Sequence, residues 1–269
     1  MRLMKIFSLI FSGILISSPL FAREIEETFR KNLPVNDATL LSVENKNGSI
    51  EIKSWDRDEV EIVAYKKVRA DNKEAAMRLM EELEIVINQR GDEIEVVTEY
   101  PNSRNRGHDE GFWSWIMGRS GNTGYSVSYE IHVPKKFDLN LQSTNGRLEV
   151  MECDGRMRLE TTNGKIIAND VSGSIRCNTT NGSITASFIE VTEEEEMSFT
   201  STNGSIKVYL PRHIDADVRA RTTNGSIDCD LPIRERSGRS RKSLDAVIND
   251  GGMVIYFKTT NGSIHIRES

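Results

Sequence analysis

The stretch Thr180-Asn181-Gly182-Ser183-Ile184 decides the fold, because the chain repeats it with small changes. Asn-Gly occurs seven times, beginning at residues 47, 145, 163, 181, 203, 224 and 261. From the second occurrence onward the residue before Asn is always Thr, and in every copy the second residue after Gly is Ile or Leu. Self-similarity of this kind is typical of repeat architectures, in which one short unit stacks on the next.

The spacing of the copies favours a β-solenoid. Asn145, Asn163 and Asn181 are 18 residues apart, and the later intervals are 22, 21 and 37 residues. Weaker half-copies at Gly155 and Gly173 place glycines nine residues apart, so each copy predicts a strand-turn-strand-turn unit with alternate side chains inward. We expect an all-β, β-helix-like stack of coils of 18–22 residues. An antiparallel meander or a β-sandwich is the alternative.

The Asn-Gly pairs predict tight turns, because both residues tolerate the positive φ that such turns require. The predicted turn positions of the repeat region are Asn145, Gly146, Asn163, Gly164, Asn181, Gly182, Asn203, Gly204, Asn224, Gly225, Asn261 and Gly262. If the copies stack in register, their Asn amides would bond along the stack, as in the ladders of cross-β structures.

The amino terminus predicts export. A short basic start with Arg2 and Lys5 precedes an apolar stretch that closes at Leu20-Phe21-Ala22, which is typical of a cleaved secretory signal peptide. We therefore expect residues 1–22 to be removed and no transmembrane segment to remain. The predicted location is the periplasm, the cell surface or the exterior.

The remaining chain divides into four expected regions. Residues 23–35 are expected to be a linker, and 36–100 an amino-terminal β-region that contains a first degenerate copy. Within it, residues 72–83 have the spacing of a short amphipathic helix, and Asp71 with Glu74 resembles a capping box. Residues 101–124 lack any period and predict an insertion loop. Residues 125–269 form the repeat solenoid.

Charge and composition exclude several classes of function. The net charge of −6 becomes −8 without residues 1–22, which argues against nucleic acid as a partner. Cys153, Cys177 and Cys229 have no zinc-site spacing, and we expect small buried apolar fillers rather than a disulfide. The chain lacks the motifs of nucleophilic hydrolases, zinc proteases and nucleotide-binding loops. We therefore expect no catalytic residues, no metal and no cofactor.

Two segments are candidates for binding. The interval between the last two copies holds a cluster of cations that suits phosphate or carboxylate groups of an envelope polymer: Arg234, Arg236, Arg239, Arg241 and Lys242. The insertion holds an apolar group that would make a contact surface if exposed: Phe112, Trp113, Trp115 and Ile116. The alternatives are a solvated loop for the first segment and a lid over the end of the stack for the second.

The chain resembles the bacterial putative-adhesin domains of unknown function. The resemblance rests on the Asn-Gly-Ser-Ile unit at residues 47–50, on Val133-Pro134-Lys135, on Leu231-Pro232 and on the run of Thr-Asn-Gly copies, and it covers about residues 36–267. It implies an extracytoplasmic, β-helix-like module. The insertion at 101–124 departs from a plain member.

Three functions fit these observations. The first is an exported, envelope-associated, adhesin-like module that binds a cell-envelope polymer or an envelope protein without catalysis. The second is a structural or stress-sensing envelope protein that acts through protein contacts. The third is a polysaccharide-active β-helix enzyme, which would need clustered carboxylates that the outward strand positions do not supply.

Overall fold

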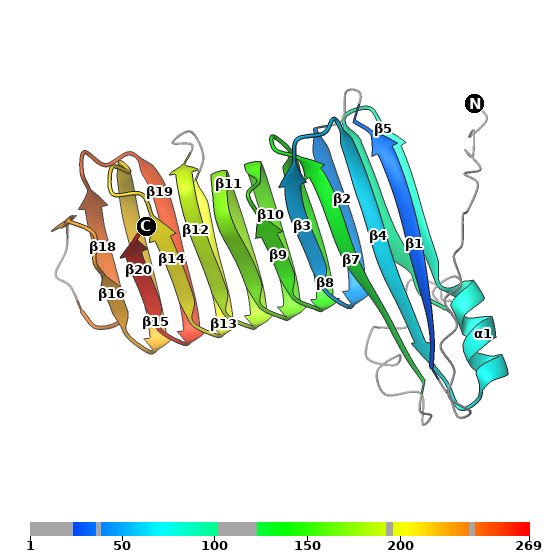
Figure 1. Cartoon of the computed structure of the whole chain (residues 1–269). Coiled ribbons are helices and arrows are strands. Elements are labelled where there is room, and N and C mark those ends of the chain that lie inside the picture. Colours follow the sequence, from blue (N-terminus) through cyan, green and yellow to red (C-terminus); the bar gives the residue numbers. More distant parts are fainter. Residues whose placement is uncertain (1–23, 36–38, 102–122, 192–195, 237–239) are drawn as a thin grey trace.

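The computed structural model describes residues 24–35, 39–101, 123–191, 196–236 and 240–269. They form 20 β-strands and one α-helix, so the all-β prediction is confirmed. The strands stack along one axis as a flattened solenoid whose two faces enclose a single hydrophobic core (Figure 1).

The faces are named A and B. Face A contains, in spatial order, β5 (Glu84–Arg90), β6 (Glu93–Glu99), β2 (Leu40–Asn47), β8 (Asp138–Asn145), β10 (Asp154–Asn163), the second half of β11 (Ile166–Asn181), β13 (Met197–Asn203), β19 (Met253–Asn261), β15 (Ala216–Asn224), β18 (Ser243–Ile248) and β17 (Ile233–Glu235). Face B contains β1 (Glu24–Pro34), β4 (Glu59–Arg69), β7 (Gly124–Pro134), β3 (Ile50–Trp55), β9 (Leu148–Met151), the first half of β11, β12 (Ile184–Val191), β14 (Ile206–Leu210), β20 (Ile264–Glu268) and β16 (Ile227–Cys229).

The strand pairing confirms the solenoid and excludes the meander. In the stack, neighbouring strands are parallel and residues one coil apart pair, so that Asn163 lies between Asn145 and Asn181. A meander would require antiparallel neighbours. Among the described strands, antiparallel pairs are confined to the two ends: β1–β4, β4–β7 and β5–β6 at one end, and β15–β18 and β17–β18 at the other.

The second residue after each Gly points inward, as the alternation predicts. Each of these side chains is at most 5% exposed: Ile50, Leu148, Ile166, Ile184, Ile206, Ile227 and Ile264. Removing one such side chain from water contributes roughly 1.5–3 kcal/mol. Their column is therefore a main source of the free energy that holds the coils together.

The Asn side chains form the predicted ladder on the outside of the stack. Six of the seven side chains donate through Nδ2 to the Oδ1 of the Asn in the adjacent coil at 2.7–2.8 Å, and Asn47 only accepts in this ladder. In spatial order the ladder runs through Asn224, Asn261, Asn203, Asn181, Asn163, Asn145 and Asn47. The first copy, at Asn47, thus belongs to the same stack as the others.

The coil order in space differs from the order in sequence at the carboxyl-terminal end. β19 lies between β13 and β15, and β20 lies between β14 and β16. The last copy along the chain is therefore inserted between the two copies that precede it. The 37-residue interval before Asn261 contains β17 and β18, and β18 pairs antiparallel with β15 at the end of the stack.

The turn glycines are required by close stacking, and the explanation from positive φ is wrong for most of them. Among the Asn-Gly glycines only Gly48 has φ in the left-handed region, at +119°. A Cβ at Gly146 would collide with the carbonyl oxygen of Gly48, and one at Gly164 with that of Gly146. The same collision recurs in the later coils. Adjacent backbones meet at this corner, so no side chain fits.

A buried row of hydroxyl groups lies two residues before each Asn of the repeat. Five of them donate to the Gly carbonyl of the adjacent coil at 2.8–3.1 Å: Thr161, Thr179, Ser201, Thr222 and Thr259. In the first coil Asn45 takes this place, and its Nδ2 lies 3.3 Å from the oxygen of Gly48. These bonds satisfy carbonyl groups at the corner that would otherwise be buried without a partner.

The amino-terminal end differs from the expected division into regions. Residues 23–35 are not a linker, because β1 occupies most of them and pairs with β4 along its whole length. The predicted helix is present as α1 (Lys73–Glu82), packed against β1 and β4, but its cap is Asn72 rather than Asp71: Asn72 Oδ1 accepts from the amide of Ala75 at 2.8 Å. Both β-regions belong to one stack, since β2 pairs with β8.

Two predicted features lie outside the described residues. They are the signal peptide, residues 1–22, and the apolar group of the insertion, Phe112, Trp113, Trp115 and Ile116. Within the part of the chain that the structure describes, no helix is long and apolar enough to cross a membrane.

Replacing Gly164 by Ala tests the corner. The new Cβ would collide with the backbone oxygen of Gly146, so we expect the free energy of unfolding in urea to fall by roughly 1–3 kcal/mol. Gly124→Ala is the control, because a Cβ at Gly124 meets nothing within 4 Å. Equal stability of the two variants would contradict the close-stacking explanation.

The paired threonines of one copy test the buried row. Thr179 donates to the oxygen of Gly164 at 3.0 Å, whereas its neighbour Thr180 is exposed. We expect Thr179→Val to lower the free energy of unfolding by about 1–3 kcal/mol, because the Gly164 carbonyl loses its partner, and Thr180→Val to change it little. Thermal and urea denaturation of both variants measure the difference, and a larger loss in Thr180→Val would refute the assignment.

Candidate anion-binding surface

Face A presents two outward rows to solvent, and both are placed by the repeat. The residues five positions before each Asn make one row, which in spatial order reads Ser42, Asn140, Arg158, Arg176, Ser198, Tyr256 and Arg219. The residues three positions before make the other: Glu44, Gln142, Glu160, Asn178, Thr200, Lys258 and Arg221. The face therefore changes along its length from acidic to basic, although the whole chain is acidic.

Three cations meet at the basic end. A pocket of 460 Å³, here the basic pocket, is lined by Arg221, Thr222, Thr223, Lys242, Ser243, Lys258 and Thr259. Arg221 on β15 pairs in register with Lys258 on β19 and with Ser243 on β18. The amide of Thr222 donates to the carbonyl oxygen of Lys242 at 3.0 Å, which holds Lys242 at the edge of β15.

The basic pocket is electrostatically unbalanced. Among the described residues, its lining contains three cationic side chains and no carboxylate. In the described part of the chain, Arg221, Lys242 and Lys258 have no ion-pair partner, and Asp217 on β15 is already bound by Arg236 at 2.8 Å. Like charges on neighbouring strands repel each other, and a bound anion would relieve that repulsion. This arrangement is therefore suited to binding an anion.

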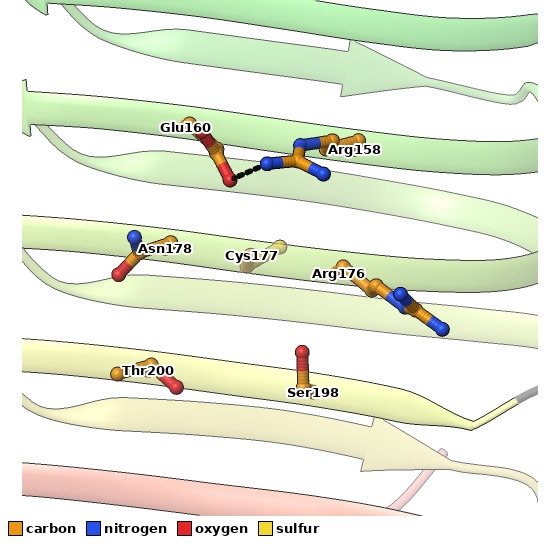
Figure 2. Close-up of a pocket in the computed structure, with 7 residues that line it drawn as sticks. All are labelled: Arg158, Glu160, Arg176, Cys177, Asn178, Ser198 and Thr200. Carbon is orange, nitrogen blue, oxygen red and sulfur yellow. Dashed lines mark ion pairs between the residues drawn. The ribbon is translucent and has the colours of Figure 1, made fainter.

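A second depression lies closer to the middle of the same face. This polar groove, of 280 Å³, is lined by Arg158, Glu160, Arg176, Cys177, Asn178, Ser198 and Thr200. Figure 2 shows Arg158 turned toward Glu160, with which it forms an ion pair at 2.8 Å, and Arg176 turned away from that pair. The short side chains of β13, Ser198 and Thr200, leave the depression open.

The structure separates most of the cations that the sequence groups together. Arg234 lies exposed on β17, and Arg236 is bound by Asp217. Arg239 lies outside the described residues. Arg241 is exposed in the turn before β18, and of the four described members Lys242 is the one that lines the basic pocket.

Arg221 and Lys258 are absent from the sequence-based site. Both residues stand three positions before the Asn of their copy, and this shared position predicts that their side chains point outward on the same face. Their adjacency follows from the inserted coil, which brings Lys258 beside Arg221.

A family model described as Toastrack DUF4097 matches residues 32–267. The chain belongs to the Toastrack family. None of the curated proteins matches it. Among solved structures, a putative cell adhesion protein from Clostridium sporogenes is 12% identical over 91% of this chain and 100% of that one, with a TM-score of 0.43.

Two further solved structures are more distant from this Toastrack chain. A putative adhesin from Bacteroides fragilis is 10% identical over 90% of this chain and 97% of that one, with a TM-score of 0.29. A putative lipid binding protein from Parabacteroides distasonis is 12% identical over 90% and 95%, also with a TM-score of 0.29. At these scores the likeness does not bear on function.

Two cysteines of this Toastrack chain, Cys153 and Cys177, are unsuited to nucleophilic chemistry. None of the three cysteines forms a disulfide with another described residue, Cys153 and Cys177 are buried, and Cys229 is partly exposed. Burial raises the pKa of the Cys153 thiol to about 12 and raises that of Cys177 as well. A nucleophilic cysteine needs a lowered pKa and access to solvent. Among the described residues, no three His, Cys, Asp or Glu side chains gather to hold a metal ion.

Thiol labelling tests this assignment. Because their pKa values lie well above 8, Cys153 and Cys177 carry almost no thiolate at pH 8, and burial also blocks the reagent. We expect a water-soluble disulfide reagent to modify Cys229 in the native protein and the other two only in denaturant. Rapid labelling of a native Cys229→Ser variant would refute it.

Proposed function

We propose that this Toastrack protein is a non-catalytic, exported binding module that holds an anionic polymer of the cell envelope through the basic pocket. The observation that carries the proposal is the convergence of Arg221, Lys242 and Lys258 without a carboxylate in the part of the lining that the structure describes. The signal-peptide pattern of residues 1–22 supports a location outside the cytoplasm. A protein partner in the envelope is the alternative occupant.

The chemistry of the lining favours phosphate or carboxylate groups. The planar guanidinium of Arg221 can donate two parallel hydrogen bonds to either group, and the two lysines add point charges. Four hydroxyl side chains, those of Thr222, Thr223, Ser243 and Thr259, complete the lining, although Thr222 and Thr259 point inward and are bonded to glycine carbonyls. Thr223 and Ser243 are thus the hydroxyl groups with access to a ligand.

The same set of residues supports binding rather than catalysis. Hydrolysis or elimination on an acidic polymer needs a positioned base or a pair of carboxylates. Two carboxylates of face A near the cations are engaged: Glu160 pairs with Arg158 at 2.8 Å, and Asp217 with Arg236 at 2.8 Å. A third, Asp245 on β18, faces Arg219 in register and is not part of the lining of the basic pocket.

A charge-neutralised variant tests the proposal. We expect Arg221→Gln/Lys242→Gln/Lys258→Gln to weaken binding to purified lipopolysaccharide by tenfold or more, where tenfold corresponds to about 1.4 kcal/mol. Raising the salt concentration should weaken binding of the unmodified protein in the same direction. Surface plasmon resonance or sedimentation with the mature protein gives the affinity.

The matched control is Lys53→Gln/Lys165→Gln/Lys207→Gln. It removes the same charge from exposed residues on face B and at its edge, away from the basic pocket. An equal loss in both triple variants would show only a general charge effect. Unchanged binding in the pocket variant would refute the proposed site.

A further inference from the structure

We infer that the ligand is a linear acidic polysaccharide that lies across the strands of face A, along the solenoid axis, from the basic pocket to Arg176. This inference rests on the proposed function and adds the ligand class and its orientation. It is carried by the spacing of cations on successive strands and by the uncharged, hydroxyl-bearing strand between them.

Three cations without an ion-pair partner among the described residues lie on strands that follow one another along the axis, with Arg176 in one outward row and Lys258 and Arg221 in the other. Arg176 is on β11, and β13, β19 and β15 follow it in the stack. Lys258 is on β19 and Arg221 on β15, so the line begins and ends with positive charge. Neighbouring strands are about 4.8 Å apart, which places Arg221 about 14 Å from Arg176 along the axis. A single phosphate or carboxylate cannot span that distance, whereas a chain with charges at intervals can.

The strand between the two positive regions offers hydrogen bonds and no charge. β13 presents Ser198 and Thr200 outward, in register with Arg176 and Asn178 on one side and with Tyr256 and Lys258 on the other. Figure 2 shows Thr200 on the strand next to Asn178 and Ser198 on the same strand nearer Arg176, and all four line the polar groove. Hydroxyl and amide groups suit the hydroxyl groups of sugars, which an acidic polysaccharide carries between its charges.

Arg219 extends the basic region beside this line. Its guanidinium donates to the hydroxyl of Tyr256 at 3.1 Å and lies 5.6 Å from the centre of that ring. The contact holds the cation on the outer row without neutralising it. On β18, next to β15, Asp245 pairs in register with Arg219. The basic region is therefore followed by a negative charge at this end of face A.

The opposite limit of the line is also set by charge. On β10, Glu160 neutralises Arg158 at 2.8 Å, and beyond it Glu44 on β2 and Glu95 on β6 make the face acidic. A polyanion is therefore attracted over β11 to β15 and repelled beyond β10. Nucleic acid is the less suitable polyanion, because the two rows contain one aromatic side chain, Tyr256, where a single strand needs several stacking platforms.

Oligogalacturonates of one, two, four and eight units provide a probe of defined length. We expect the affinity of the mature protein to rise at least tenfold from the monomer to the octamer, because a second contact on the same chain is intramolecular. We expect Arg176→Gln to weaken octamer binding about threefold to fivefold and to leave monomer binding unchanged. The triple variant of the basic pocket should weaken binding at every length.

The control is Lys165→Gln, an exposed cation at the turn edge, which should leave all affinities unchanged. Equal affinity for monomer and octamer, with both sensitive to the pocket variant, would overturn the inference and leave the proposed function intact. Equal loss of monomer and octamer binding in Arg176→Gln would also overturn it.

Two outcomes address the class of ligand. Pocket-dependent binding of lipopolysaccharide without binding of any oligogalacturonate would overturn the polysaccharide assignment alone. Single-stranded DNA of matched charge that binds as tightly as the octamer would replace it with a general polyanion site. Failure of every anion to bind would refute the proposed function as well.

Discussion

The close approach of adjacent backbones at the glycine corner sets the register of every coil. The corner excludes a Cβ, the hydroxyl row bonds the glycine carbonyl, and the asparagine ladder joins the same coils from outside. Together they hold residues such as Asn163 and Asn181 opposite each other. A slip of one residue would turn Ile166 and its equivalents toward water, so the core and the outer rows depend on the same contact.

The sequence predicts what recurs at a constant spacing. Inward positions such as Ile184, the asparagine ladder and the solenoid all follow from alternation and period. The sequence analysis misses β1 because the face that points inward is not uniformly apolar. On that face Ile25, Phe29 and Leu33 alternate with the charged residues Glu27 and Lys31. In the structure Lys66 binds Glu27 at 3.1 Å, a partner 39 residues away that no local pattern indicates.

The candidate site was predictable only in part. Clustering along the sequence singles out residues 234–242, yet Arg236 is neutralised by Asp217 of another strand, and of the described cations in this segment only Lys242 lines the basic pocket. Aligning the copies on Asn places Arg221 and Lys258 on one face. Sequence order would put Arg221 beside Thr200, because nothing in near-identical copies says which one stacks on which.

The inserted coil gives this end of the molecule a particular order of assembly. Strands β15 and β16 come before β19 and β20 in the sequence, yet in the folded protein they do not pair with β13 and β14, because β19 and β20 lie between them. The stack is therefore continuous at this end only once residues 253–268 have taken their place in it. Lys258 and Thr259 belong to this segment and line the basic pocket, so the pocket is complete only after the segment has joined the stack.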